Sequence, residues 1–218
     1  MKEEYFTPAS LAMVARALLL EAQAPHRTKP VFRADDSALL ILDMQEYFLQ
    51  EESHAFVPSA RAILPGLQAL VNAWARRGLP VIYTRHLNTA ENAAGMAGWW
   101  RELLVEENPL SAITPHFDVS SGEVIHKSQY DAFYSTALEA RLRALGKSQV
   151  VVCGVMTHLC CETTARSAFM RGFEVFFPVD GTASYNQGFH RATLLNLAHG
   201  FATLTLTGDL LAALNEGE

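Results

Sequence analysis

The chain has 218 residues, of which 50% are apolar and 18% are charged, enough apolar material for one sizeable core, which excludes a disordered protein. Its 17 Lys and Arg against 23 Asp and Glu give a net charge of −6 without a long basic run, which argues against a nucleic-acid partner. No stretch approaches the roughly 18 continuous apolar residues of a membrane span, and three cysteines do not make a secreted disulfide framework, so we expect a cytoplasmic protein.

The first predicted element is an amphipathic helix over residues 8–22, with Thr7 as its N-cap. An arginine interrupts its apolar run and acidic residues precede it, the reverse of the pattern in a signal peptide. Residues 25–30 then link this helix to the rest of the chain. We therefore predict an N-terminal extension over residues 1–35, which we expect to pack on a neighbouring subunit, and a main domain over residues 36–218.

From residue 37 onward, short aliphatic or β-branched runs alternate with amphipathic helical patterns. The predicted strands are 38–42, 81–84, 124–126, 150–153, 174–179 and 203–206. The predicted helices are 60–77, 133–145 and 160–171, each followed by a glycine that suits a left-handed C-cap. The first strand is aliphatic at four consecutive positions, which indicates burial on both faces and hence a parallel sheet between helices. The predicted fold is a three-layer α/β domain.

Chemistry-bearing residues follow several of these strands at their carboxyl ends, where open α/β sheets bind ligands. The first strand ends at Asp43, the third at Lys127, and the fourth leads through a short segment to Cys160. The second strand ends in Arg85 and His86. An acid, a base and a thiol that reach one edge of the sheet from separate strands predict a catalytic site.

Each of these residues also has a common structural explanation. An aspartate at the end of a strand, such as Asp43, is equally explained by an Asx-turn. If Asp43 is functional, we expect it to be a proton acceptor whose pKa is raised by partial burial. Lys127 is by default a solvated lysine. Buried cysteine is usually a small apolar filler, and we interpret Cys153 and Cys161 in that way. Cys160 begins a predicted helix, whose N-terminus favours the thiolate and whose free amides can hold an oxyanion, although spacing alone does not choose between the two adjacent thiols.

The eight histidines show no spacing typical of a metal site. His158 stands next to the thiols without a CxxC or HxxxH pattern, and zinc needs three or four converging ligands. We therefore predict neither a metal nor another cofactor. Aromatic residues that follow strand ends are candidates for the apolar walls of a small-ligand pocket, and they are Tyr47, Phe48, Trp99, Trp100 and Tyr130.

Three segments, in this order along the chain, resemble the isochorismatase-like cysteine hydrolases, a family that includes nicotinamidases, N-carbamoylsarcosine amidohydrolase and isochorismatase. Residues 39–45 (LLILDMQ) resemble the family's opening strand with its Asp-x-Gln. Residues 127–133 (KSQYDAF) resemble its lysine segment, and residues 154–160 (GVMTHLC) resemble its nucleophile segment. The resemblance covers residues 36–210 and implies a six-stranded parallel sheet flanked by helices.

By this resemblance Asp43, Lys127 and Cys160 form a catalytic triad, with Cys160 rather than its neighbour as the nucleophile. The resemblance also implies a cis peptide between Val155 and Met156, and an oxyanion hole made by the amides of Met156 and Cys160. The implied activity is hydrolysis of a C–N bond in a small amide, carbamoyl or ureido compound through a thioester. The implied partner is this small molecule, with no nucleic acid or membrane, and the implied assembly is a homodimer or homotetramer.

Two departures from the family pattern bear on the substrate. Residues 84–87 lack the metal cluster that nicotinamidases carry after the second strand, which argues against a nicotinamide substrate held by zinc. Asp131 stands where many relatives have Ser and brings an extra negative charge near the site. The expected pocket residues are Gln45, Phe48, Arg85, His86, Trp99 and Tyr130.

Two alternatives to the amidohydrolase remain open. One is an isochorismatase-type vinyl ether hydrolase, in which Asp43 acts as general acid and the cysteine is dispensable. The other is a non-catalytic homologue that binds a small ligand or partner, which would be favoured by a Cys160 thiol that is unreactive and shows no depressed pKa in an iodoacetamide pH–rate profile.

Overall fold

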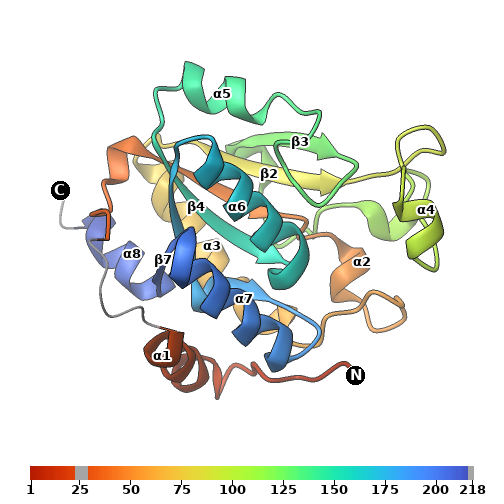
Figure 1. The fold of residues 1–218 in the computed structure, drawn as a ribbon, viewed down its shortest axis with the longest axis horizontal. Helices are drawn as coiled ribbons and strands as arrows, with labels where there is room; N and C mark the ends of the chain where they lie inside the picture. The colour runs from red at the N-terminus through yellow and green to blue at the C-terminus, as the bar shows by residue number, and fades with distance from the viewer. Residues whose placement is uncertain (23–28, 216–218) are drawn as a thin grey trace.

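The computed structural model describes residues 1–22 and 29–215. Most of the predicted linker and the last three residues of the predicted main domain therefore lie outside the described residues. Within them, one parallel sheet runs through the molecule in the order β3-β2-β1-β4-β5-β7, with β6 beside the end of β4 (Figure 1). Its strands are β1 (Ser37–Leu42), β2 (Val81–His86), β3 (Glu123–Lys127), β4 (Gln149–Val155), β5 (Glu174–Pro178), β6 (Thr182–Ala183) and β7 (Thr203–Thr205).

Helices cover both faces of the sheet, which makes three layers (Figure 1). The helix α3 packs against β1, β2 and β4 and also against α8, while α6 packs against β4, β5 and α7. The helices are α1 (Leu11–Ala22), α2 (Glu46–Leu49), α3 (Ala60–Arg76), α4 (Met96–Trp99), α5 (Leu138–Ala144), α6 (Glu162–Met170), α7 (Gln187–Gly200) and α8 (Thr207–Asn215). None of the helices in the described ranges has the length and apolar character needed to cross a bilayer.

The two central strands, β1 and β4, show why the sequence predicts a parallel sheet between two layers of helices. Every residue of β1 and β4 is buried, because helices cover the sheet on both sides. Their parallel register pairs Leu42 with Gly154, so both strands end at the same edge of the sheet. The six predicted strands and the three-layer architecture are confirmed, and the sheet gains only the two-residue strand β6, which is too short to produce a sequence pattern.

Helix boundaries differ more from the prediction. The predicted helix at 133–145 begins only at Leu138, because residues 131–136 form turns in which the Thr136 hydroxyl donates to the Ala132 carbonyl (2.6 Å). The predicted helix at 8–22 begins at Leu11, after a turn in which the Thr7 hydroxyl accepts from a backbone amide (3.1 Å). The helices α7 and α8 have no predicted counterpart. The buried face of α7 includes a histidine and a threonine, which hides its apolar periodicity.

The described part of the N-terminal extension packs on its own chain. The side chain of Phe6 is fully buried, and α1 contacts α7 and the turn after β5. The hydroxyl of Tyr5 accepts a hydrogen bond from the Ser184 amide and contacts Nδ1 of His190, both at 2.9 Å. The main domain thus supplies apolar and polar partners for residues 5 and 6, and packing of the extension on a neighbouring subunit stays a prediction.

Candidate active site

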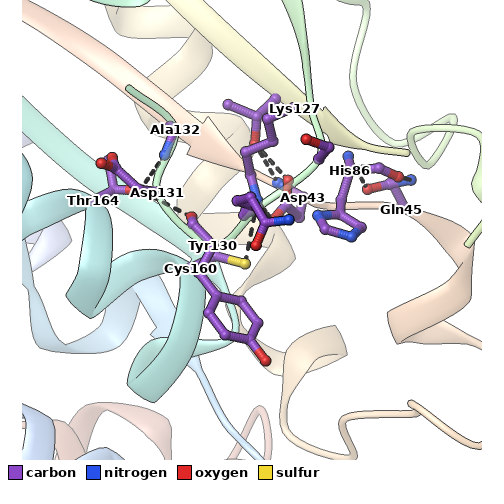
Figure 2. Close-up of polar contacts among 12 residues, drawn as sticks. Asp43, Gln45, His86, Lys127, Tyr130, Asp131, Ala132, Cys160 and Thr164 are labelled. Carbon is purple, nitrogen blue, oxygen red and sulfur yellow. Dashed lines mark hydrogen bonds and ion pairs between the residues drawn. The ribbon is translucent and has the colours of Figure 1, made fainter. Parts of the chain in front are cut away.

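Three side chains from separate strands meet at the carboxyl edge of the sheet (Figure 2). Asp43 follows β1, Lys127 ends β3, and Cys160 lies shortly after β4. The Lys127 Nζ lies 2.8 Å from Oδ2 of Asp43 and donates to Sγ of Cys160 at 3.3 Å. The structure therefore brings together the acid, the base and the thiol that the sequence singles out.

Asp43 is fixed by its backbone and by the neighbouring strand. Its φ of 52° lies in the left-handed region, which turns the chain away from the direction of β1. The Thr84 hydroxyl of β2 accepts from the Asp43 amide (3.1 Å) and donates to Oδ1 of its carboxylate (2.6 Å). Thr84 is thus a positioning residue that sequence analysis missed, because the match between residues on neighbouring strands is visible only once their register is known.

Cys160 lies in a π-helical turn, Thr157–Cys161, that precedes α6. The carbonyl of Met156 accepts from the amides of Leu159 and Cys161 (3.1 and 3.2 Å), so the chain coils as soon as β4 ends. The peptide bond before Met156 is cis, as the resemblance implies. Cys160 accordingly lies in the first turn of a helical segment, as predicted, although α6 itself starts two residues later.

The carboxylate and the ammonium are both ionised. Burial is the largest influence on the Asp43 carboxyl and raises its pKa. The charge of Lys127, together with smaller contributions from His86 and Cys160, lowers the pKa more, so it ends below its usual value. Burial lowers the pKa of Lys127, but the charge of Asp43 together with contributions from Cys160 and the hydrogen bonds to both groups raises it more. The predicted rise in the pKa of Asp43 is therefore wrong, because the buried side chain has a cation at ion-pair distance.

The thiol of Cys160 is protonated at neutral pH. Burial and the charge of Asp43 raise its pKa to about 12, although Lys127 opposes the rise. The expectation that the helix N-terminus favours a resting thiolate is therefore wrong for this chain. The three side chains therefore rest as a carboxylate, an ammonium and a neutral thiol.

The other cysteines behave as apolar filler. Cys153 and Cys161 are fully buried, and burial raises the pKa of both thiols. All three cysteines of the chain are free. Only Cys160 among them belongs to the wall of the cavity at the carboxyl edge of the sheet.

This cavity has a volume of about 60 Å³ and an aromatic, largely apolar wall. Three of the six expected pocket residues, Phe48, His86 and Tyr130, line it. Met156 and Cys160, whose amides the resemblance assigns to an oxyanion hole, line it as well. The remaining wall is formed by Tyr47, His54, Ala55, Asn88, Met96, Trp100, Glu102, Leu103, Leu104, Leu159 and Tyr185.

Two of the other expected pocket residues, Gln45 and Arg85, do not line the cavity. Gln45 is fully buried, accepts from the amide of His86 (2.8 Å), and donates to the carbonyls of His86 and Ser111 (3.1 and 2.7 Å). Arg85 donates to the carbonyl and the hydroxyl of Ser111 (2.9 and 2.7 Å) and pairs with Glu106 (3.3 Å). Both side chains are committed to the protein, so neither is free for a ligand.

The third, Trp99, is 78% exposed, and its neighbour Trp100 lines the cavity instead. The indole of Trp100 donates to the Tyr130 hydroxyl at 2.7 Å, which joins the two aromatic side chains. The sequence offers two adjacent tryptophans, and only the phase of the one-turn helix α4 decides which one turns inward.

His86 is a neutral wall residue. Burial, assisted by the charge of Lys127, lowers its pKa to about 4. Its Nε2 contacts Oδ1 of Asn88 (2.9 Å), whose amide group donates to the carbonyl of Ser128 (2.9 Å). Within the described residues, no group of three or more His, Cys, Asp and Glu side chains is arranged to hold a metal ion.

Asp131 lies close to the site in sequence but faces α6. Its carboxylate accepts from the Phe133 amide (2.8 Å) and from the Ser167 hydroxyl of α6 (2.6 Å). It is not among the charges that shift the pKa of Cys160. The expected extra negative charge is therefore turned away from the thiol.

Comparison with known proteins gives a consistent result. The family model described as Isochorismatase domain matches residues 37–209. The chain is 39% identical over 173 residues to Nicotinamidase 3 of Arabidopsis thaliana, covering 77% of this chain and 83% of that protein. It is 29% identical over 184 residues to Isochorismatase of Bacillus subtilis, covering 80% of this chain and 57% of that protein. A cysteine hydrolase structure from Pseudomonas syringae pv. phaseolicola superposes with a TM-score of 0.83 at 23% identity, covering 89% of this chain and all of that one, a likeness of fold.

Proposed function

The chain belongs to the isochorismatase family of hydrolases, and from that premise we propose that it cleaves the C–N bond of a small carboxamide, carbamoyl or ureido compound through a thioester on Cys160. Asp43 and Lys127 are the other members of the proposed triad. One observation carries the proposal: the buried Lys127 ammonium contacts both the Asp43 carboxylate and the Cys160 sulfur, and that sulfur lies at the cavity wall.

The first chemical step is the acylation of Cys160. The Cys160 proton moves to the Asp43 carboxylate while the sulfur electron pair attacks the carbonyl carbon, and the C=O electron pair moves onto oxygen. The amides of Met156 and Cys160 are the proposed donors to this oxyanion, and a donor of this kind typically accounts for roughly 10² to 10³ in turnover. Lys127 keeps the buried site close to electrical neutrality while the proton moves.

The second step releases the amine and restores the thiol. The tetrahedral intermediate collapses, the C–N bond breaks, and protonated Asp43 gives its proton to the leaving nitrogen. Asp43 then accepts a proton from a water molecule that attacks the thioester carbon. The C–S bond breaks, Cys160 regains its proton from Asp43, and the acid product leaves. Lys127 remains an ammonium throughout, in agreement with its raised pKa.

The cavity wall supports a flat, apolar substrate body. Aromatic rings of Tyr47, Phe48, Trp100, Tyr130 and Tyr185 enclose it, and such rings bind planar groups by stacking and edge contacts. The 39% identity to a protein named a nicotinamidase points in the same direction. We therefore favour a carboxamide on an aromatic ring over an aliphatic ureido compound.

Ammonia release from a panel of ring carboxamides tests the proposal. Cys160→Ala should abolish turnover, whereas Cys161→Ala, the adjacent buried thiol outside the cavity wall, should retain it. Asp43→Asn should also abolish turnover, because the thiol loses its base. Ether cleavage of isochorismate that survives Cys160→Ala but not Asp43→Asn would replace the proposal with the isochorismatase-type reaction. Turnover of an amide by Cys160→Ala at the wild-type rate would refute it.

A further inference from the structure

The cavity wall carries a polar cluster that the proposed chemistry does not use. Tyr47 of α2, His54 of the following loop and Glu102 of the loop after α4 all line the cavity. The Tyr47 hydroxyl donates to Oε1 of Glu102 at 2.8 Å, and Nδ1 of His54 lies 3.0 Å from the same oxygen. Three separate segments thus hold one carboxylate at the wall that also contains the reactive thiol.

The Glu102 carboxylate is ionised, and one of its two oxygens makes no hydrogen bond within the described residues. The hydrogen bond from Tyr47 lowers the pKa of Glu102 more than burial raises it, with a further lowering from His54. Burial raises the pKa of Tyr47, so its hydroxyl keeps its proton and donates. Both contacts use Oε1, and among the described residues no hydrogen bond engages Oε2. The side chain of Glu102 is 50% exposed, which keeps Oε2 open to a ligand.

Within the described residues, the same wall offers no side chain with a permanent positive charge. Among the described residues that line the cavity, none is Lys or Arg, and Glu102 is its only carboxylate. Lys127 lies beside Cys160, but its side chain is fully buried and paired with Asp43. A ligand that brought a carboxylate into this cavity would therefore leave that charge unpaired in a largely apolar site, which is unfavourable.

Two cations near the cluster do not change this conclusion. Lys2 donates to the backbone carbonyl of His54 and lies over the ring of Tyr185 (4.8 Å to its centroid), so its ammonium is engaged by the protein. Arg101 is close enough to Glu102 for its charge to lower the pKa of that carboxyl. Neither side chain belongs to the lining of the cavity.

We propose that Glu102 is a specificity-determining residue whose free oxygen accepts an N–H group of the substrate, so that the cavity selects ring carboxamides that are neutral or cationic at their remote end and rejects those that carry a carboxylate. This inference rests on the proposed amidohydrolase function and adds the charge of the substrate to it.

Three probes with the same ring and the same scissile group test the inference: benzamide, 3-(aminomethyl)benzamide and 3-carbamoylbenzoate. For the wild type we expect kcat/KM to fall in the order cationic, neutral, anionic. Because Glu102 is half exposed, its charge is partly screened, and Glu102→Gln should lower the cationic-to-anionic ratio by about fivefold. Glu102→Lys should invert the order. Glu107→Gln removes an exposed carboxylate of the same loop outside the cavity lining, and it should leave the ratio unchanged.

The outcomes separate this inference from the function on which it rests. A wild type that prefers the anionic probe, or a Glu102→Gln ratio equal to that of Glu107→Gln, overturns the role of Glu102 while the thioester chemistry stands. If no probe is hydrolysed, the binding of the three probes is compared instead. The measurement is how strongly each probe slows the alkylation of Cys160 by iodoacetamide. A carboxylate probe that protects best would then refute the inference, and loss of protection by the cationic probe in Glu102→Gln would support it.

Discussion

Replacing Lys127 by Met tests the charge state of the buried triad most severely. Lys127 and Asp43 have no exposed side-chain surface and lie 2.8 Å apart, so their attraction amounts to about 6 kcal/mol at an effective dielectric constant of ~20. Removal of the ammonium leaves a buried carboxylate without a counter-charge, and a buried pair broken in this way typically costs about 3–5 kcal/mol. We expect Lys127→Met to lose an amount in this range from its free energy of unfolding near neutral pH.

The loss should depend on pH with a defined sign. In the wild type the pKa of Asp43 is lowered, so its stabilising contribution is complete above the unfolded pKa of about 4 and disappears as pH falls through the folded value. In Lys127→Met the largest influence, burial, acts without the opposing charge of Lys127 and raises that pKa, so the contribution of Asp43 to stability is greatest at low pH and falls as pH rises.

Urea unfolding at about pH 8 and about pH 5 measures this difference, because the slope and midpoint give the free energy at each pH. The destabilisation of Lys127→Met should be large at the higher pH and smaller at the lower one. The double variant Asp43→Asn/Lys127→Met, which buries no charge, should be more stable than the single variant at the higher pH. A loss below about 1 kcal/mol, or an equal loss at both pH values, would refute the assigned ionisation.

Three further predictions concern the Cys160 thiol, the N-terminal extension and the glycine near the end of β4. Asp43→Asn should speed the alkylation of Cys160 by iodoacetamide at mildly alkaline pH, because it removes a charge that raises the thiol pKa; an equal or slower rate would contradict this. Tyr5→Phe should cost about 1–3 kcal/mol in urea unfolding, since it leaves the buried Ser184 amide without a partner and removes one of two contacts to Nδ1 of His190, and an unchanged midpoint would contradict this. Gly154→Ala should cost more than about 4 kcal/mol or prevent folding, because its Cβ would collide with a carbonyl of β1 at a φ of 110°. Gly146→Ala, also at positive φ but in open space, should cost only about 1 kcal/mol and is the matched control.

The sequence predicts the strands well where burial on both faces requires a particular residue type. Central strands covered on both faces need unbroken apolar residues, so the run ending at Leu42 located β1 and with it Asp43. Parallel strands end at one edge of the sheet, so Lys127 and Cys160 were expected at the same place. The contacts of Lys127 with Asp43 and Cys160 confirm that these side chains lie together. Each of the three residues lies at the end of a predicted strand or shortly after it.

What escaped sequence analysis depends on distances and on loops. The sign of the pKa shift of Asp43 follows from an ion pair whose length no spacing reveals. The choice of Trp100 over Trp99 depends on the phase of a one-turn helix. His54 and Glu102 lie in connections without periodicity, so the polar cluster at the cavity wall has no sequence signal.

The central claim is that Cys160 carries the acyl group, and intact-mass spectrometry tests it directly. After incubation with a mixed library of ring carboxamides and rapid acid quench, the wild type should gain the mass of one acyl group, located by peptide mapping to Cys160. Cys161→Ala should gain the same mass, and Cys160→Ala should gain none. An adduct on another residue, or amide turnover by Cys160→Ala, would contradict the account.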